Sequence, residues 1–196
     1  MTSQEALALL KEGNARFSQG KPERPNQDEA RRTNIADKGQ NPFAAVLSCS
    51  DSRKPVELLF DRGLGDIFVV RVAGNVAGVD QVGSLEYAVE HLGVPLIVVL
   101  GHNKCGAVTA VVEGYEAHGN IRAIVEKIAP VVEETRKVNP NLPMNKLVDE
   151  CVLANVRHVA HYLSANSAII KHAVESGALK IIGANYHIRT GQVSWE

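Results

Sequence analysis

Two apolar runs that each end in metal-binding side chains place the strongest constraint on this chain. Residues 43–47 lead into Cys49, and residues 95–100 lead into His102 and Cys105. Both runs have the length and apolar character of buried strands. Strands that are parallel neighbours end at the same edge of their sheet. The two thiols and the imidazole then converge on one point, which is the ligand set of a zinc ion with one coordination position left open.

Two charged residues beside Cys49 favour a catalytic site over a structural one. Asp51 and Arg53 follow the same strand end, two residues apart. Arg53 can hold Asp51 in a charge-assisted pair, which keeps the carboxylate ionised. Asp51 is then able to accept a hydrogen bond from a zinc-bound water. Zinc lowers the pKa of such a water to about 7, so that a hydroxide nucleophile is available at neutral pH.

The spacing alone leaves other interpretations open. A cysteine after a strand is commonly a small buried hydrophobe, and an exposed Asp–Arg pair contributes little stability. A Cys–His protease dyad that uses Cys49 or Cys105 also fits, although it gives the second thiol no role. A cysteine phosphatase loop is excluded, because Pro55 stands where such a loop needs its arginine.

The pattern of apolar residues predicts an α/β fold with a mostly parallel central β-sheet flanked by helices. No linker or repeat interrupts the pattern, so residues 1–196 are expected to form a single domain. Pro130 is expected to kink or divide the helix that contains it. Strands are expected at residues 43–47, 67–72, 95–100, 178–184 and 190–195, with helices at about 55–60, 80–92, 105–113, 120–139, 145–163 and 166–176.

The first 38 residues are expected to form an N-terminal helical arm. Helices are predicted at residues 3–17 and, mostly polar, at 27–37, separated by a segment rich in Gly and Pro. Such an arm has little apolar surface to bury by itself, which predicts that it lies against a partner subunit rather than in the core. A polar surface helix is the alternative.

Bulk composition narrows the class of protein. The chain has 196 residues, 45% hydrophobic and 22% charged, which suits one domain with its own core. A formal net charge of -1 gives no reason to expect nucleic acid or an anionic membrane as a partner. The 3 cysteines do not form a disulfide framework and suit a reducing compartment. The polar N-terminus does not resemble a secretory signal, so a cytoplasmic location is expected.

Taken together, the motifs resemble the β-class carbonic anhydrases of the plant-like and bacterial type. The resemblance covers nearly the whole chain and implies the β-carbonic anhydrase fold. It also implies reversible hydration of carbon dioxide to bicarbonate and a proton by attack of zinc-bound hydroxide. The matching stretches are residues 10–17, Cys49-Ser50-Asp51-Ser52-Arg53, residues 65–75 and 83–89, Gly101-His102-x-x-Cys105-Gly106, and residues 183–193.

The resemblance assigns a role to each residue of the metal motif. It implies that Zn²⁺ is held by Cys49, His102 and Cys105. It implies that Asp51 orients the zinc-bound hydroxide or, in a resting form, takes the fourth position on zinc. Arg53, by pairing with Asp51, is expected to keep that resting form open.

The resemblance also places a substrate pocket. Gln40 is expected to donate a hydrogen bond to a substrate oxygen, and apolar side chains with one backbone segment are expected to line the rest. His91 stands where a proton shuttle has been proposed in this family, and a solvated helix histidine is the competing interpretation. The expected pocket residues are Gln40, Phe68, Ala73, Tyr87 and Gly106.

Two residues depart from the family pattern. Lys54 replaces a small apolar residue, which predicts either an altered site entrance or a side chain in solvent. Ala73 replaces a common valine and widens the expected pocket, so hydrolysis of carbonyl sulfide or carbon disulfide on the same zinc site is the alternative function. A third possible function is a binding module that only senses bicarbonate or inorganic ions, with structural zinc. As partners, the resemblance implies the small-molecule substrate and a second copy of the chain, in a homodimer or a dimer of dimers.

Overall fold

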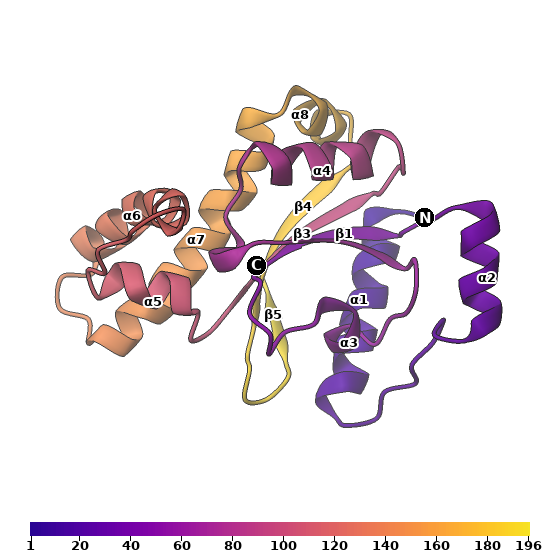
Figure 1. Ribbon diagram of the computed structural model, residues 1–196, viewed down its shortest axis with the longest axis horizontal. Helices are drawn as coiled ribbons and strands as arrows, with labels where there is room; N and C mark the ends of the chain where they lie inside the picture. The colour runs from indigo at the N-terminus through magenta and orange to yellow at the C-terminus, as the bar shows by residue number, and fades with distance from the viewer.

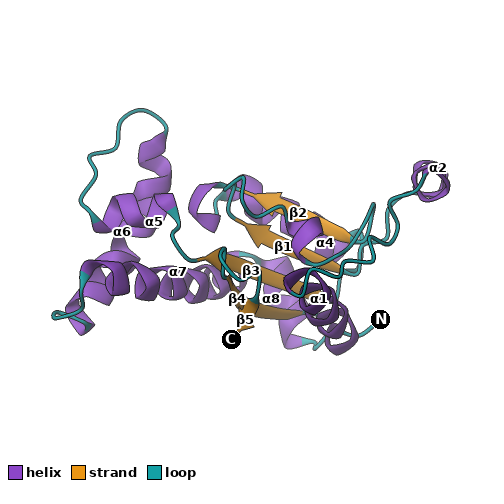
Figure 2. Cartoon of the chain, turned by 90° about the horizontal axis from the view of Figure 1, so that it is seen from below, coloured by secondary structure: helices purple, strands orange, loops and turns teal.

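Figure 1 shows the whole chain, and Figure 2 shows its five strands, which form one sheet in the order β2-β1-β3-β4-β5. The computed structural model describes residues 1–196. The first four strands are parallel, and β5 runs antiparallel to β4, which confirms the predicted mostly parallel sheet. The strands are β1 (Ala44–Ser48), β2 (Ile67–Arg71), β3 (Leu96–His102), β4 (Lys180–Tyr186) and β5 (Val193–Trp195).

Helices cover both faces of the sheet. One face packs against α1 and α3, and the other packs against α4, α7 and α8. A third apolar cluster joins α5, α6 and α7 beyond the end of the sheet (Figure 2). The helices are α1 (Ser3–Ser18), α2 (Glu29–Lys38), α3 (Val56–Leu59), α4 (Val79–Glu90), α5 (Gly106–Val112), α6 (Ile121–Val138), α7 (Met144–Asn166) and α8 (Ala168–Glu175), and a 3-10 turn, η1, spans Ala73–Asn75. None of them combines the length and hydropathy needed to cross a bilayer.

The two central strands position the functional residues. Every residue of β1 and β3 is buried, as expected for parallel strands covered on both faces. β1 pairs with β3 up to Ser48 opposite Leu100. Because the strands run in the same direction, Cys49 and His102 leave the sheet at the same edge.

The N-terminal helix belongs to the core, so the predicted arm is wrong for α1. Ala6 and Leu10 are completely buried within the cluster under the α1 face of the sheet. The apolar stripe of α1 is short, but α3 and β3 offer a surface that it covers. In contrast, α2 has no buried residue and lies apart from the remaining helices (Figure 2).

The predicted division of the helix at Pro130 does not occur. Helix α6 runs through this residue from Ile121 to Val138. Proline removes one backbone hydrogen bond from a helix interior. Here Ile128, Val131 and Val132 are buried on both sides of Pro130, and this packing supports the helix across the missing bond.

Candidate metal centre

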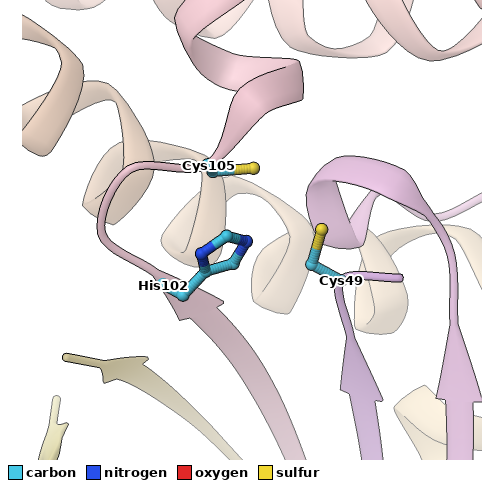
Figure 3. A group of neighbouring side chains, drawn as sticks. All are labelled: Cys49, His102 and Cys105. Carbon is cyan, nitrogen blue, oxygen red and sulfur yellow. The ribbon is translucent and has the colours of Figure 1, made fainter. Parts of the chain in front are cut away.

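The structure brings Cys49, His102 and Cys105 together at the carboxyl edge of the sheet (Figure 3). Cys49 follows β1, His102 is the last residue of β3, and Cys105 immediately precedes α5. Their ligand atoms all lie within 4.8 Å of one another. All three residues are buried, with 5%, 0% and 1% of their surface exposed. This cluster matches the convergence predicted from the two strand ends.

The imidazole of His102 is prepared to bind a cation through Nε2. Its Nδ1 lies 2.9 Å from the carbonyl oxygen of Asn103, to which an Nδ1–H donates. This contact leaves the lone pair on Nε2. Nε2 is buried and has no hydrogen-bond partner, an arrangement that costs free energy unless something binds there. Because the ring faces both sulfur atoms (Figure 3), a metal ion held by all three residues satisfies the nitrogen.

The two thiols are also set up as a pair. A hydrogen bond from Cys105 lowers the pKa of the Cys49 thiol, and the same contact together with burial raises the pKa of the Cys105 thiol. The pKa values of the two thiols thus move in opposite directions. A bound divalent cation removes this difference between the two thiols, because it favours the thiolate form of both residues. Zinc prefers thiolate and imidazole ligands of this kind.

A glycine and an asparagine that the sequence did not single out support Cys49. The backbone N–H of Gly74 donates to the sulfur of Cys49 at 3.3 Å, and the side chain of Asn155 donates to the Gly74 carbonyl at 2.8 Å. Gly74 has a φ of +70°, and a Cβ there would lie 2.8 Å from Ile128. The sequence does contain an indication of the role of Asn155, because this residue is polar and lies on the otherwise apolar buried face of α7.

Asp51 borders the three ligands and is held by Arg53. Arg53 donates from Nε to Oδ1 of Asp51 at 2.9 Å and from Nη2 to Oδ2 at 2.6 Å. These hydrogen bonds hold the pKa of Asp51 well below its usual range. Oδ2 of Asp51 lies 3.9 Å from Nε2 of His102. The carboxylate is therefore ionised, paired and next to the cluster.

Arg71, at the end of β2, fixes the segment that carries Cys49 and Asp51. It donates to the Cys49 carbonyl at 3.1 Å and to the Asp51 carbonyl at 2.8 Å. The backbone between these two residues leaves the sheet, so its carbonyl groups have no strand partner. The guanidinium supplies donors to both carbonyls from the neighbouring strand.

Lys54 lies neither at a site entrance nor in solvent, so both predictions for it are wrong. Its exposed fraction is 0%. The turn after Arg53 directs the side chain inward, where Nζ donates to the carbonyl oxygens of Leu100 at 2.8 Å and Gly101 at 3.0 Å. Burial lowers the pKa of Lys54 to about 7.

Only two of the expected pocket residues adjoin the metal ligands within one chain. Ala73 precedes Gly74, whose N–H contacts Cys49. Gly106 follows Cys105 directly and is exposed. Both residues therefore lie beside the cluster and have little or no side chain.

The other expected pocket residues lie elsewhere in the same chain. Gln40 is exposed and precedes β1, which places it at the amino edge of the sheet. Phe68 and Tyr87 have ring centroids 6.3 Å apart on β2 and α4, and Tyr87 lies 5.0 Å from His91. Because α4 returns the chain from the end of β2 to the start of β3, His91 at its carboxyl end lies opposite the metal ligands.

Comparison with known proteins identifies the family. A family model described as carbonic anhydrase matches residues 44–193. Carbonic anhydrase 2 of Mycobacterium tuberculosis is 42% identical over 191 residues, which are 95% of this chain and 89% of that protein.

Solved structures share the fold described above. A β-carbonic anhydrase of Aspergillus fumigatus has a TM-score of 0.78 at 27% identity and covers 98% of this chain and 89% of its own. A tetrameric β-carbonic anhydrase of Sordaria macrospora has a TM-score of 0.77 at 23% identity, over 85% of this chain and 86% of its own. Because the family model matches most of the chain and the mycobacterial relative is similar over 95% of it, the chain belongs to the β-carbonic anhydrase family.

Proposed function

We propose that Cys49, His102 and Cys105 bind a zinc ion and that the protein catalyses the reversible hydration of carbon dioxide to bicarbonate and a proton. The observation that carries this proposal is the buried, unpartnered Nε2 of His102 facing two buried thiols. Three protein ligands leave one position open, which is typical of catalytic rather than structural zinc. The Asp51–Arg53 pair beside that position supports a catalytic role.

Each residue around the cluster has a separate role in the proposed reaction. Bound zinc supplies the Lewis acidity that makes a water molecule a strong nucleophile near neutral pH. Asp51 accepts a hydrogen bond from that water and orients it toward carbon dioxide. Arg53 occupies both carboxylate oxygens of Asp51, which keeps this residue beside the three ligands rather than among them. Addition of water to carbon dioxide yields bicarbonate, and the proton leaves to solvent.

Stopped-flow hydration of carbon dioxide with a pH indicator tests this function. We expect the zinc-loaded protein to accelerate the reaction far above the rate of buffer. Removal of zinc by a chelator is expected to abolish this rate, and added zinc to restore it. Carbonyl sulfide and carbon disulfide are measured with the same preparation. A protein with stoichiometric zinc but no hydration at any pH contradicts the proposal, and turnover of a sulfur substrate alone establishes the alternative.

We further propose that a second copy of the chain completes the substrate pocket. Gln40, Phe68 and Tyr87 lie away from the metal ligands of their own chain, and Tyr87 is 47% exposed. Phe68 lies on β2 and Tyr87 contacts it from α4, and β2 is an edge strand whose outer side has no partner strand. Unpaired edges of this kind readily pair with another chain. His91 beside Tyr87 is the candidate proton shuttle in this arrangement.

Sedimentation and activity test the assembly together. We expect the wild-type protein to sediment as a dimer or a larger even-numbered assembly, in keeping with the tetrameric Sordaria relative. Tyr87→Glu places a charge in the proposed contact, so it is expected to shift the protein toward monomer and to lower the hydration rate. A fully active wild-type monomer contradicts the shared pocket.

We also propose the cytoplasm as the location of the protein. All three cysteines are free, and two of them serve the metal centre as thiolates. A reducing compartment preserves thiols in that form.

A further inference from the structure

Lys54 is a buried cationic side chain for which the mechanism has no use. It is among the largest of the completely buried side chains. Removing an ammonium group from water is unfavourable unless hydrogen bonds replace its hydration. The acceptors found here are the backbone carbonyls of Leu100 and Gly101. A small apolar residue would avoid this cost, so the hydrogen bonds to these two carbonyls are what offsets the burial of Lys54.

The two carbonyls lie where β3 loses a neighbour. The pairing of β1 with β3 ends at Ser48 opposite Leu100, because Cys49 turns away toward the metal centre. Strand β3 continues for two more residues, Gly101 and His102. Lys54 therefore contacts β3 at and just beyond its last pair with β1, directly before the ligand His102.

Helix α7 holds the same short segment from another direction. A Cβ added to Gly101 would lie 2.6 Å from Val156 and 3.3 Å from Val152, so the backbone here is in close contact with α7. The side chain of Leu100 packs in the opposite cluster, with α3. The segment before His102 is thus packed on both faces, and Lys54 fixes its carbonyl groups.

We propose that Lys54 is a positioning residue of the metal centre, which holds Leu100 and Gly101 so that Nε2 of His102 faces the two thiols. The inference rests on the proposed zinc site and deepens it. Two carbonyls require two N–H donors, which both the ammonium and the neutral amine provide. The contact therefore persists over the range in which the enzyme works, and its role is geometric.

Three variants separate positioning from general stability. Lys54→Met shortens the side chain by one atom, as Lys54→Gln does, and removes its donors. Lys54→Gln keeps two N–H donors on one nitrogen without the charge. The matched control is Asn14→Ala, because Nδ2 of Asn14 is also buried and donates to two carbonyls, those of Leu59 at 3.0 Å and Gly191 at 2.8 Å. Asn14 lies on α1, and none of its hydrogen bonds reaches a metal ligand.

The readouts are the zinc dissociation constant, measured by competition with a chromophoric chelator, and the absorption spectrum of the cobalt(II) form. We expect Lys54→Met to weaken zinc binding by about 10–100-fold, as residues that orient metal ligands do, and to shift the cobalt bands. Lys54→Gln is expected to recover most of the affinity. Asn14→Ala is expected to lower the melting temperature while both metal readouts stay at the wild-type values.

Two results overturn the inference. One is a folded Lys54→Met protein with wild-type zinc affinity and an unchanged cobalt spectrum. The other is equal impairment of Lys54→Met and Lys54→Gln, which assigns the effect to charge rather than to the two donors. If Lys54→Met does not fold, a loss of affinity in Lys54→Gln as large as that expected for Lys54→Met overturns it. If the wild-type protein itself does not bind zinc, the proposed function is contradicted. This result is distinguishable because it is measured on the wild-type protein before any variant.

Discussion

His102→Ala is expected to abolish tight zinc binding and to reduce carbon dioxide hydration to the rate of buffer alone. His102 supplies the only nitrogen of the cluster, and its Nε2 is already oriented by the contact of Nδ1 with Asn103. Its removal leaves two thiols, which cannot hold zinc in a three-ligand site. We expect zinc affinity to fall by more than about 100-fold, beyond the loss typical of residues that only orient ligands.

The measurement is zinc content after dialysis, followed by stopped-flow hydration of the same sample. His161→Ala is the matched control, because His161 is an exposed histidine on α7 outside the ligand cluster. This control is expected to retain one zinc per chain and full activity. Stoichiometric zinc with normal turnover in His102→Ala would place the metal elsewhere and refute the assigned ligand set.

Asp51→Asn is expected to lower the hydration rate by about 10²–10⁴-fold, the usual contribution of a group that handles the proton of a nucleophile. The substitution keeps the shape of the side chain but removes its charge and the ion pair with Arg53. Because Asp51 is not one of the three ligands, zinc is expected to remain bound at one ion per chain. Loss of activity with metal retained separates the role of Asp51 from that of His102.

The pH dependence of this variant provides a second check. Arg53 holds the pKa of Asp51 well below its usual range, so the carboxylate is ionised throughout neutral and alkaline conditions. We therefore expect the ratio of wild-type to variant rates to stay constant from neutral to alkaline pH. A ratio that falls to one at alkaline pH contradicts a continuous role for the carboxylate.

Asp61→Asn is the matched control for Asp51→Asn. Asp61 is also paired with an arginine, Arg16, at 2.6 Å, and it accepts hydrogen bonds from the backbone of Glu23 and Arg24. These contacts tie the N-terminal segment to the residues after α3. Its replacement is expected to lower stability by about 1–3 kcal/mol, with the hydration rate of the folded protein unchanged.

The metal centre was predictable because it depends on local patterns and one general rule. The runs before Cys49 and His102 are continuous and apolar, which marks buried parallel strands. Parallel strands end at one edge of a sheet, so the ligands that follow them meet without further information. The local spacing of His102 and Cys105, and of Asp51 and Arg53, is also contained in the sequence.

What only the tertiary structure decided are the contacts between segments distant in the sequence. The core position of α1 depends on the surface that α3 and β3 present to Leu10. The continuity of α6 depends on packing on both sides of Pro130. The burial of Lys54 depends on two carbonyls more than forty residues away, and periodicity carries no signal for a charged residue that finds backbone acceptors. A sequence pattern indicates which face of a helix or strand is apolar. The position of α1, the continuity of α6 and the burial of Lys54 depend instead on the surface against which each of them packs.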